Sequence, residues 1–167
     1  MSRIDLKHAT FQFTDGAAHG LFVKLGEGNF QYTEKKERQY FRDRGRLDAV
    51  RDGDEQPVEV RFDAVWEFIA GVGDSHGTSL PSIEDALKKR NASAAWSSSD
   101  TDTCNPYALD LTLRYKPECS SVNLETLLFA DFRYEELSHD SKNATIAVSG
   151  KSNSVEAVAA RAANTGT

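Results

Sequence analysis

The sequence predicts a mainly β protein whose sheet has one buried and one solvent-facing side, with a single short α-helix beside it. Three observations carry this prediction. Apolar and polar residues alternate through Val58–Phe68, and the same alternation returns in Tyr107–Tyr115, as expected for half-buried strands. One stretch, Ser82–Arg90, has apolar residues at helical spacing between capping residues. The length of 167 residues suits one ordinary domain.

The first expected element is a hairpin near the N-terminus. Apolar residues alternate through Ile4–Phe13 and again through Leu21–Leu25. Asp15-Gly16 lies between them and favours a turn, because both residue types tolerate positive φ. Phe30–Tyr32 then begins another strand.

The clearest strand is Val58–Phe68. The residues on its buried side are expected to be Val58, Val60, Phe62, Ala64, Trp66 and Phe68. The other side carries Glu59, Arg61, Asp63 and Glu67, interrupted by Val65. Later strands are predicted at Tyr107–Tyr115, at Leu124–Tyr134 and around Ala144–Val148, with less clean alternation in Leu124–Tyr134 than in the others.

The helix is expected to begin after Ser82, whose hydroxyl can cap the first turn. Glu84 and Asp85 lie in that turn and basic residues 88–90 close the last one, which suits the helix dipole. The apolar stripe that would dock on the sheet consists of Ile83, Ala86 and Leu87.

Two further segments have no clear period. Residues 93–105 are rich in Ser, Asp and Thr and are interpreted as a loop around Trp96. The Ala-, Asn- and Thr-rich tail 152–167 is interpreted as either a weak helix or a mobile arm.

The segment 34–55 differs from the rest of the chain. Fourteen of its 22 residues are charged, seven of each sign, and the signs are interleaved. This pattern indicates salt bridges within a hairpin or across an interface. The simpler alternative is an exposed hairpin whose ion pairs contribute about 0–1 kcal/mol each. A structureless excursion of this length is uncommon in a compact domain and usually has a function.

Composition excludes several classes of protein. The net charge of −6 argues against tight binding of nucleic acid, since phosphate contacts need a basic surplus. No apolar run reaches membrane-spanning length, and the first residues lack the apolar core of a signal peptide, so synthesis in the cytosol is expected. Cys104 and Cys119 flank a probable strand and are expected to be free thiols.

The sequence contains no complete motif for catalysis or metal binding. The four histidines have no metal-ligand spacing, and neither cysteine has a CxxC partner. The glycine-rich run 71–77 fails the dinucleotide-binding pattern because His76 occupies the place of the third glycine. We therefore predict no enzyme activity, no cofactor and no metal.

An ordered series of short segments resembles the tail tube (major tail) proteins of long-tailed bacteriophages. The resemblance runs over roughly residues 4 to 153. Its segments are Lys24–Phe30, Tyr32–Lys35, Asp43–Asp48, Arg51–Pro57, Phe62-Asp63, Trp66-Glu67, Asp131–Glu135 and Val148–Asn153. None of them is a catalytic motif, so the order and the coverage carry the resemblance.

The resemblance implies an antiparallel β-sandwich or half-barrel with one flanking helix. It divides the chain into a tail-tube-like domain over 1–153, with an extended charged loop or hairpin at 34–57, and a C-terminal arm over 154–167. It also implies homo-hexameric rings that stack into a virion tail tube, which surrounds the tape measure protein and conducts DNA during ejection. Tail tip and tail terminator proteins would be further partners.

Two sets of residues follow as site candidates. Contacts between subunits and between rings are expected from the charged segment, at Arg38, Arg42, Arg44, Arg46, Arg51, Asp52, Asp54 and Glu55. A conduit for DNA should repel phosphate weakly. The lumen candidates are therefore acids on the wet sides of strands, namely Glu59, Asp63, Glu67 and Asp110.

Other classes of function stay open at this point. One alternative is a monomeric β-sandwich binding module that uses Trp66, Trp96 and nearby tyrosines as a ligand platform. Alternation places Trp66 on the buried side, which favours a core role, whereas Trp96 is undecided. Further alternatives are another component of a tail or secretion tube and a small enzyme. Among all of these hypotheses, only those that make the chain part of a tube require self-assembly into rings.

Overall fold

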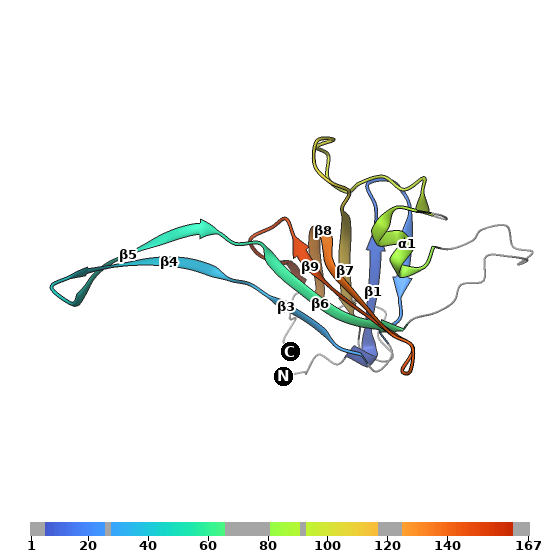
Figure 1. The fold of residues 1–167 in the computed structure, drawn as a ribbon, viewed down its shortest axis with the longest axis horizontal. Coiled ribbons are helices and arrows are strands. Elements are labelled where there is room, and N and C mark those ends of the chain that lie inside the picture. Colours follow the sequence, from blue (N-terminus) through green and yellow to red (C-terminus); the bar gives the residue numbers. More distant parts are fainter. Residues whose placement is uncertain (1–5, 26–27, 66–80, 91–92, 117–124, 162–167) are drawn as a thin grey trace, which may run out of the picture.

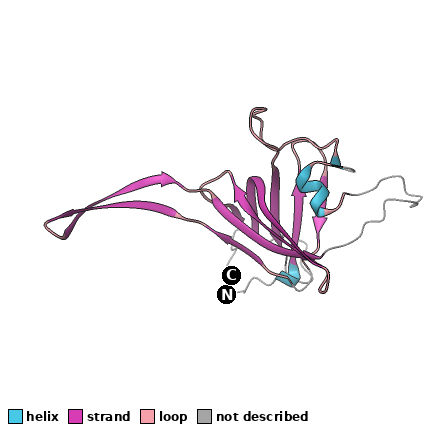
Figure 2. Ribbon diagram, in the orientation of Figure 1, coloured by secondary structure: helices cyan, strands magenta, loops and turns pink. Residues whose placement is uncertain are grey.

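The computed structural model describes residues 6–25, 28–65, 81–90, 93–116 and 125–161, and these fold mainly into antiparallel strands with one short α-helix (Figure 2). The predicted fold class is confirmed. In chain order the elements are η1 (Leu6–His8), β1 (Ala9–Thr14), β2 (Gly20–Val23), β3 (Phe30–Thr33), β4 (Lys36–Asp43), β5 (Arg46–Glu55), β6 (Val58–Val65), α1 (Ile83–Lys88), β7 (Leu109–Tyr115), β8 (Glu125–Asp140), β9 (Thr145–Ser152) and β10 (Val158–Arg161). In the part of the chain so described, no helix has the length and apolar character needed to cross a membrane.

Eight of the strands form one hydrogen-bonded sheet in the order β2-β1-β7-β8-β9-β6-β3, with β10 also paired to β8. The long strand β8 serves both halves of this sheet. Its first half pairs with β7 and β10, and its second half, from Phe132 to Asp140, pairs with β9. All of these pairings are antiparallel. Because β8 takes part in both halves, this one strand joins them.

The sheet folds over at β8, so that its two halves pack face to face. Phe11 on β1 and Phe62 on β6 lie four strands apart along the sheet, about 19 Å if it were flat, yet their ring centroids are 4.9 Å apart. Phe30 on β3 likewise meets Phe129 on β8 at 5.6 Å. The amide of Val65 on β6 donates to the carbonyl of Lys24, just beyond β2, which joins the two halves at one end. The result is a curled sandwich, consistent with a half-barrel.

Strand alternation fills the core between the two layers. Val58, Val60, Phe62 and Ala64 are all buried, as their even spacing predicted. Trp66, Glu67 and Phe68, which the sequence assigned to the same strand, lie outside the described residues. The expected strand at 124–134 is longer than predicted, since β8 continues to Asp140.

The turn between β1 and β2 clamps the loop that follows α1. The side chain of Asp15 is fully buried and accepts hydrogen bonds from the amides of Ala17, His19 and Ser97 and from the His19 ring. Burial by itself would raise the pKa of Asp15, but these hydrogen bonds outweigh it and lower the pKa. His19 stacks on Trp96, which is only 4% exposed. Trp96 is therefore a core residue and not a ligand platform.

The helix α1 forms as its sequence predicts. The Ser82 hydroxyl accepts the amide of Asp85, and Lys89 ends the helix in the left-handed conformation at φ 52°. Ala86 and Leu87 are buried, and the Tyr107 hydroxyl donates to the carbonyl of Ala86. The helix thus packs on the body through its apolar stripe.

Two expectations near the chain ends differ from the structure. Residues 6–8, expected to begin a strand, form a 3₁₀ turn, because three alternating residues are too few to distinguish the two periods. The tail 152–167, interpreted as a weak helix or a mobile arm, contributes strand β10 (Val158–Arg161), which pairs with Glu125–Leu128 of β8. An otherwise unpaired edge of β8 selects the strand there, and local sequence does not encode that edge.

Candidate assembly surfaces

The charged segment forms a two-stranded ribbon, β4 and β5, that projects from the body of the molecule (Figure 1). Every residue of the ribbon is exposed except Gly53, which is partly exposed. A two-stranded hairpin alone is marginally stable in water. The ribbon therefore lacks packing that would stabilise it, and contact with another molecule would supply that packing.

The ribbon reverses at a tight two-residue turn. Arg44 and Gly45 connect β4 to β5 with φ of 49° and 81°. Positive φ at both central positions is the type I′ geometry that matches the twist of a hairpin. Because a Cβ atom at Gly45 would meet nothing within 4 Å, the role of this glycine is conformational and not steric. The turn presents Arg42, Arg44 and Arg46 together at the tip.

The pairing register gives the ribbon two different sides. Opposed residues of an antiparallel pair share a side. Tyr40 pairs with Val50, and Arg42 pairs with Leu47 after a bulge at Asp48. Tyr40, Leu47 and Val50 are 58%, 66% and 52% exposed and form what we call the apolar side. Phe41 and Ala49 pair on the opposite side, the Phe41 side.

The ribbon's charges are only partly paired within the chain. Asp52 accepts a hydrogen bond from Arg38 at 3.1 Å and forms an ion pair with Lys36 at 3.6 Å. The Arg51 guanidinium lies 5.2 Å from the centroid of the Phe41 ring. Within the described part of the chain, Arg42, Arg44 and Arg46 at the tip form no ion pair, and neither do Asp54 and Glu55 at the base. The predicted contact residues thus lie on one projection. Asp43 and Asp48 lie near its tip as well, so the tip carries charges of both signs.

The lumen candidates do not share one surface. Glu59 and Asp63 lie on the outer side of β6, opposite its buried residues. Cations neighbour them, since Glu59 pairs with Lys35 at 3.0 Å and Glu135 nearby pairs with Lys151 at 3.5 Å. Glu67 lies outside the described residues. Asp110 belongs to β7, in the other layer.

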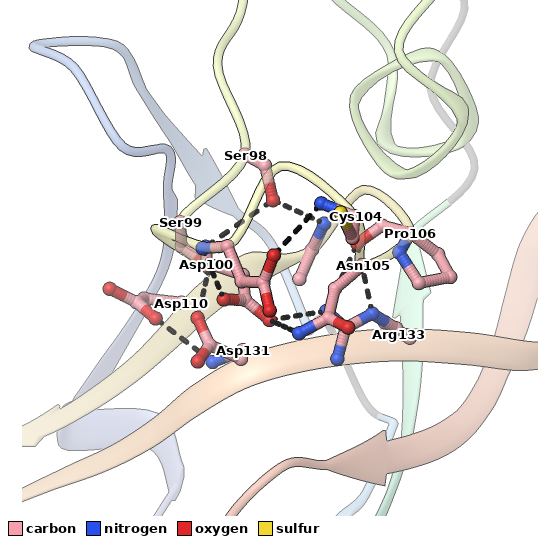
Figure 3. A network of polar contacts seen from close by, with 11 residues as sticks. Ser98, Ser99, Asp100, Cys104, Asn105, Pro106, Asp110, Asp131 and Arg133 are labelled. Carbon is pink, nitrogen blue, oxygen red and sulfur yellow. Dashed lines mark hydrogen bonds and ion pairs between the residues drawn. The ribbon is translucent and has the colours of Figure 1, made fainter.

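Asp110 is part of a polar network at the bend of β8 (Figure 3). Asp131 adopts φ 53°, a conformation that Asp tolerates better than most residues, and its amide donates to Asp110 Oδ1 at 3.0 Å. The Ser99 hydroxyl donates to Asp131 Oδ1 at 2.7 Å. Arg133 holds the adjoining loop through Asp100, at 2.8 Å, and through the carbonyl of Pro106. This network fixes the point where β8 passes from one layer to the other.

The bend gives a pH-dependent prediction. Burial raises the pKa of Asp110, and the Asp131 carboxylate adds to the rise, against opposing hydrogen bonds from Asp131 and Ser99. A carboxyl whose pKa is higher folded than unfolded costs stability while ionised, and this cost disappears as the pH falls through the folded pKa. We expect Asp110→Asn, which keeps an acceptor for the Asp131 amide, to be more stable than the wild type at pH 7 by about 1 kcal/mol.

The measurement is the thermal midpoint of both proteins at pH 7 and near pH 4. The advantage of Asp110→Asn should shrink on acidification, because the wild-type carboxyl then becomes neutral as well. A variant less stable than the wild type at pH 7 would show that the ionised carboxylate is favourable at the bend.

The apolar side and the bend network were not predicted from the sequence. The apolar residues between the charges of 34–55 were the available signal for the first, and nothing local indicates the second. Cys104 is an exposed free thiol, and Cys119 lies outside the described residues. In the described ranges, no three His, Cys, Asp or Glu side chains gather as a metal site would require.

No protein-family model and no curated protein matches the chain. Solved structures do share its fold. A structure of an extracellular contractile injection system, the PVC sheath/tube terminator in the extended state, matches with a TM-score of 0.57 and 11% identity over 96% of this chain and 98% of that one. The anti-feeding prophage (AFP) tube-terminating cap matches with a TM-score of 0.57 and 11% identity over 97% and 93% of the two chains. The PVC sheath-tube complex in the extended state matches with a TM-score of 0.55 and 10% identity over 96% of this chain and 93% of that one.

Proposed function

We propose that this chain is a non-enzymatic structural subunit of a phage-like tail tube, in which homo-hexameric rings stack into a conduit. The observation that carries the proposal is the ribbon, an exposed projection that carries unpaired charges of both signs. A closed ring that also stacks needs head-to-tail contacts between unlike surfaces of identical subunits. Arg38, Arg42, Arg44, Arg46, Arg51, Asp52, Asp54 and Glu55 are proposed as the residues that make these contacts.

The fold supports the same proposal. The structures that resemble it are named as a sheath/tube terminator, a tube-terminating cap and a sheath-tube complex. Tape measure, tail tip and tail terminator proteins would be the partners of the assembled tube, and the virion tail its location.

A second candidate is favoured by two of those names. A tube terminator closes the end of a tube, so it would form a ring without stacking on further copies of itself. The same subunit surfaces would then make contacts within a ring, while the stacking surface would meet a different protein.

Negative-stain electron microscopy of the purified wild-type protein separates these possibilities. Long tubes would support the tail tube role, and isolated rings would support the terminator role. A protein that stays monomeric at every concentration tested would contradict both and would revive the binding-module alternative.

The wall that faces the channel is proposed to be the outer side of β6 with Glu59 and Asp63. The cations beside these acids keep the negative electrostatic potential of the wall weak. Because a weakly negative wall repels phosphate and salt screens what remains, we expect the wild type to show no measurable affinity for duplex DNA at physiological salt. Replacing both residues by Lys should preserve assembly, because neither side chain is part of the core, yet should slow DNA ejection by adding phosphate contacts. Ejection from particles carrying the variant measures this.

Micromolar binding of DNA by the wild type would contradict the proposed wall. So would a structure of the assembly in which Glu59 and Asp63 face outward.

A further inference from the structure

The ribbon's two sides expose apolar surface unequally. The apolar side combines Tyr40, Leu47 and Val50, all more than half exposed, with Arg42 beside Leu47 as its cross-strand partner. On the Phe41 side the aromatic ring is 45% exposed, and the Arg51 guanidinium lies over it. Contiguous exposed apolar residues on a soluble protein mark interaction sites more often than isolated ones do. The apolar side is therefore the better candidate for a contact.

The ribbon gains no packing from its own body. Its residues are exposed on both sides, whereas strands β6 and β7 bury every second residue or more. Tyr40 and Val50 are direct cross-strand partners, which favours the hairpin but leaves their outward surface in water. A projection of this kind is expected to be completed by another molecule.

The charges indicate which molecule that is. Arg46 and Asp54 stand at opposite ends of β5, about 25 Å apart along an extended strand, so the tip arginines cannot reach the base carboxylates of their own ribbon. Asp43 and Asp48 also lie near the tip, and Lys36 lies at the base, so each end carries charges of both signs. A second copy can therefore supply opposite charges to either end.

Arg42 and Leu47 share the apolar side, whereas Arg46 pairs with Asp43 on the other side. A partner that meets Arg42 therefore also meets the apolar residues.

We infer that the ribbon docks through one side only, and that a second copy of this chain covers the apolar side formed by Tyr40, Leu47 and Val50. This inference rests on the proposed function and adds to it the side of the ribbon that is buried. The Phe41 side stays in solvent together with Arg51, which lies over its ring, so Arg51 is not among the contact residues on this inference.

Adjacent residues on opposite sides provide the test. Tyr40→Ser and Leu47→Ser remove contacts on the apolar side, and Phe41→Ser is the matched control on the other. Sedimentation velocity and negative stain give the concentration at which each protein assembles. We expect this concentration to rise at least about tenfold for Tyr40→Ser and Leu47→Ser, and to change less than about twofold for Phe41→Ser. Circular dichroism should show folded subunits throughout, because all three side chains are exposed in the lone chain.

Each result decides between the proposals. Assembly of the wild type together with unimpaired assembly of Tyr40→Ser would overturn the inference and assign the apolar side to a different protein, while the tube role would stand. Equal damage by Phe41→Ser and Tyr40→Ser would overturn the sidedness. A wild type that never assembles would overturn both the inference and the proposed function.

Discussion

Replacing Phe62 by alanine is expected to lower the free energy of unfolding by about 3–5 kcal/mol. Phe62 is 1% exposed and stands where the two layers of the folded sheet meet. Its ring centroid lies 4.9 Å from Phe11, 5.9 Å from Phe13 and 6.2 Å from Phe30. Removing the ring leaves a cavity between strands of both layers, which cannot collapse without moving the sheet. Domains of this size have only about 5–15 kcal/mol of stability, so the variant would be close to unfolding at moderate temperature.

Phe22 provides the matched control. It is also a strand phenylalanine, but it is 65% exposed on the edge strand β2, so Phe22→Ala should change stability by no more than about 0.5 kcal/mol. Urea unfolding followed by near-ultraviolet circular dichroism measures both variants. A loss below about 1 kcal/mol for Phe62→Ala would mean that β1 and β6 do not pack across a common core.

Elements with a local signal were predictable from the sequence. The alternation in Val58–Val65 and Leu109–Tyr115 reflects burial on one side, and the structure places both strands accordingly. The helix was predictable because capping is local, with Ser82 and Lys89 at its two ends. These signals depend only on residues within one or two turns of each other.

Features that depend on distant partners were not predictable. The order β2-β1-β7-β8-β9-β6-β3 depends on which edges meet, and alternation carries no information about that choice. The bend of β8 at Asp131 depends on Asp110, 21 residues earlier in the chain. In the ribbon both sides are exposed, so Tyr40 and Phe41 do not show the alternation that burial imposes elsewhere.

The tip of the ribbon leads to the second large effect. We expect the double variant Arg44→Glu, Arg46→Glu to block tube growth while leaving a folded subunit. Both arginines are exposed and, in the described part of the chain, form no ion pair. Arg46→Glu places a carboxylate opposite Asp43, so the double change should lower subunit stability by no more than about 1 kcal/mol. In an assembly, each reversed charge would face carboxylates of another copy, and like charges in close contact cost several kcal/mol. Since every subunit carries the change, the penalty is repeated at every contact along the tube.

Two further variants make this result specific. Reversing Lys116 and Lys142, exposed lysines of the body, matches the change in net charge and should leave tube growth intact. Adding Asp54→Arg and Glu55→Arg to the tip variant restores opposite signs between tip and base, so tubes should return if those base carboxylates are the partners. Electron microscopy scores all four proteins. Normal tubes from the tip variant would contradict the proposed role of the arginines, because a contact that depends on Arg44 and Arg46 cannot form with two carboxylates in their place.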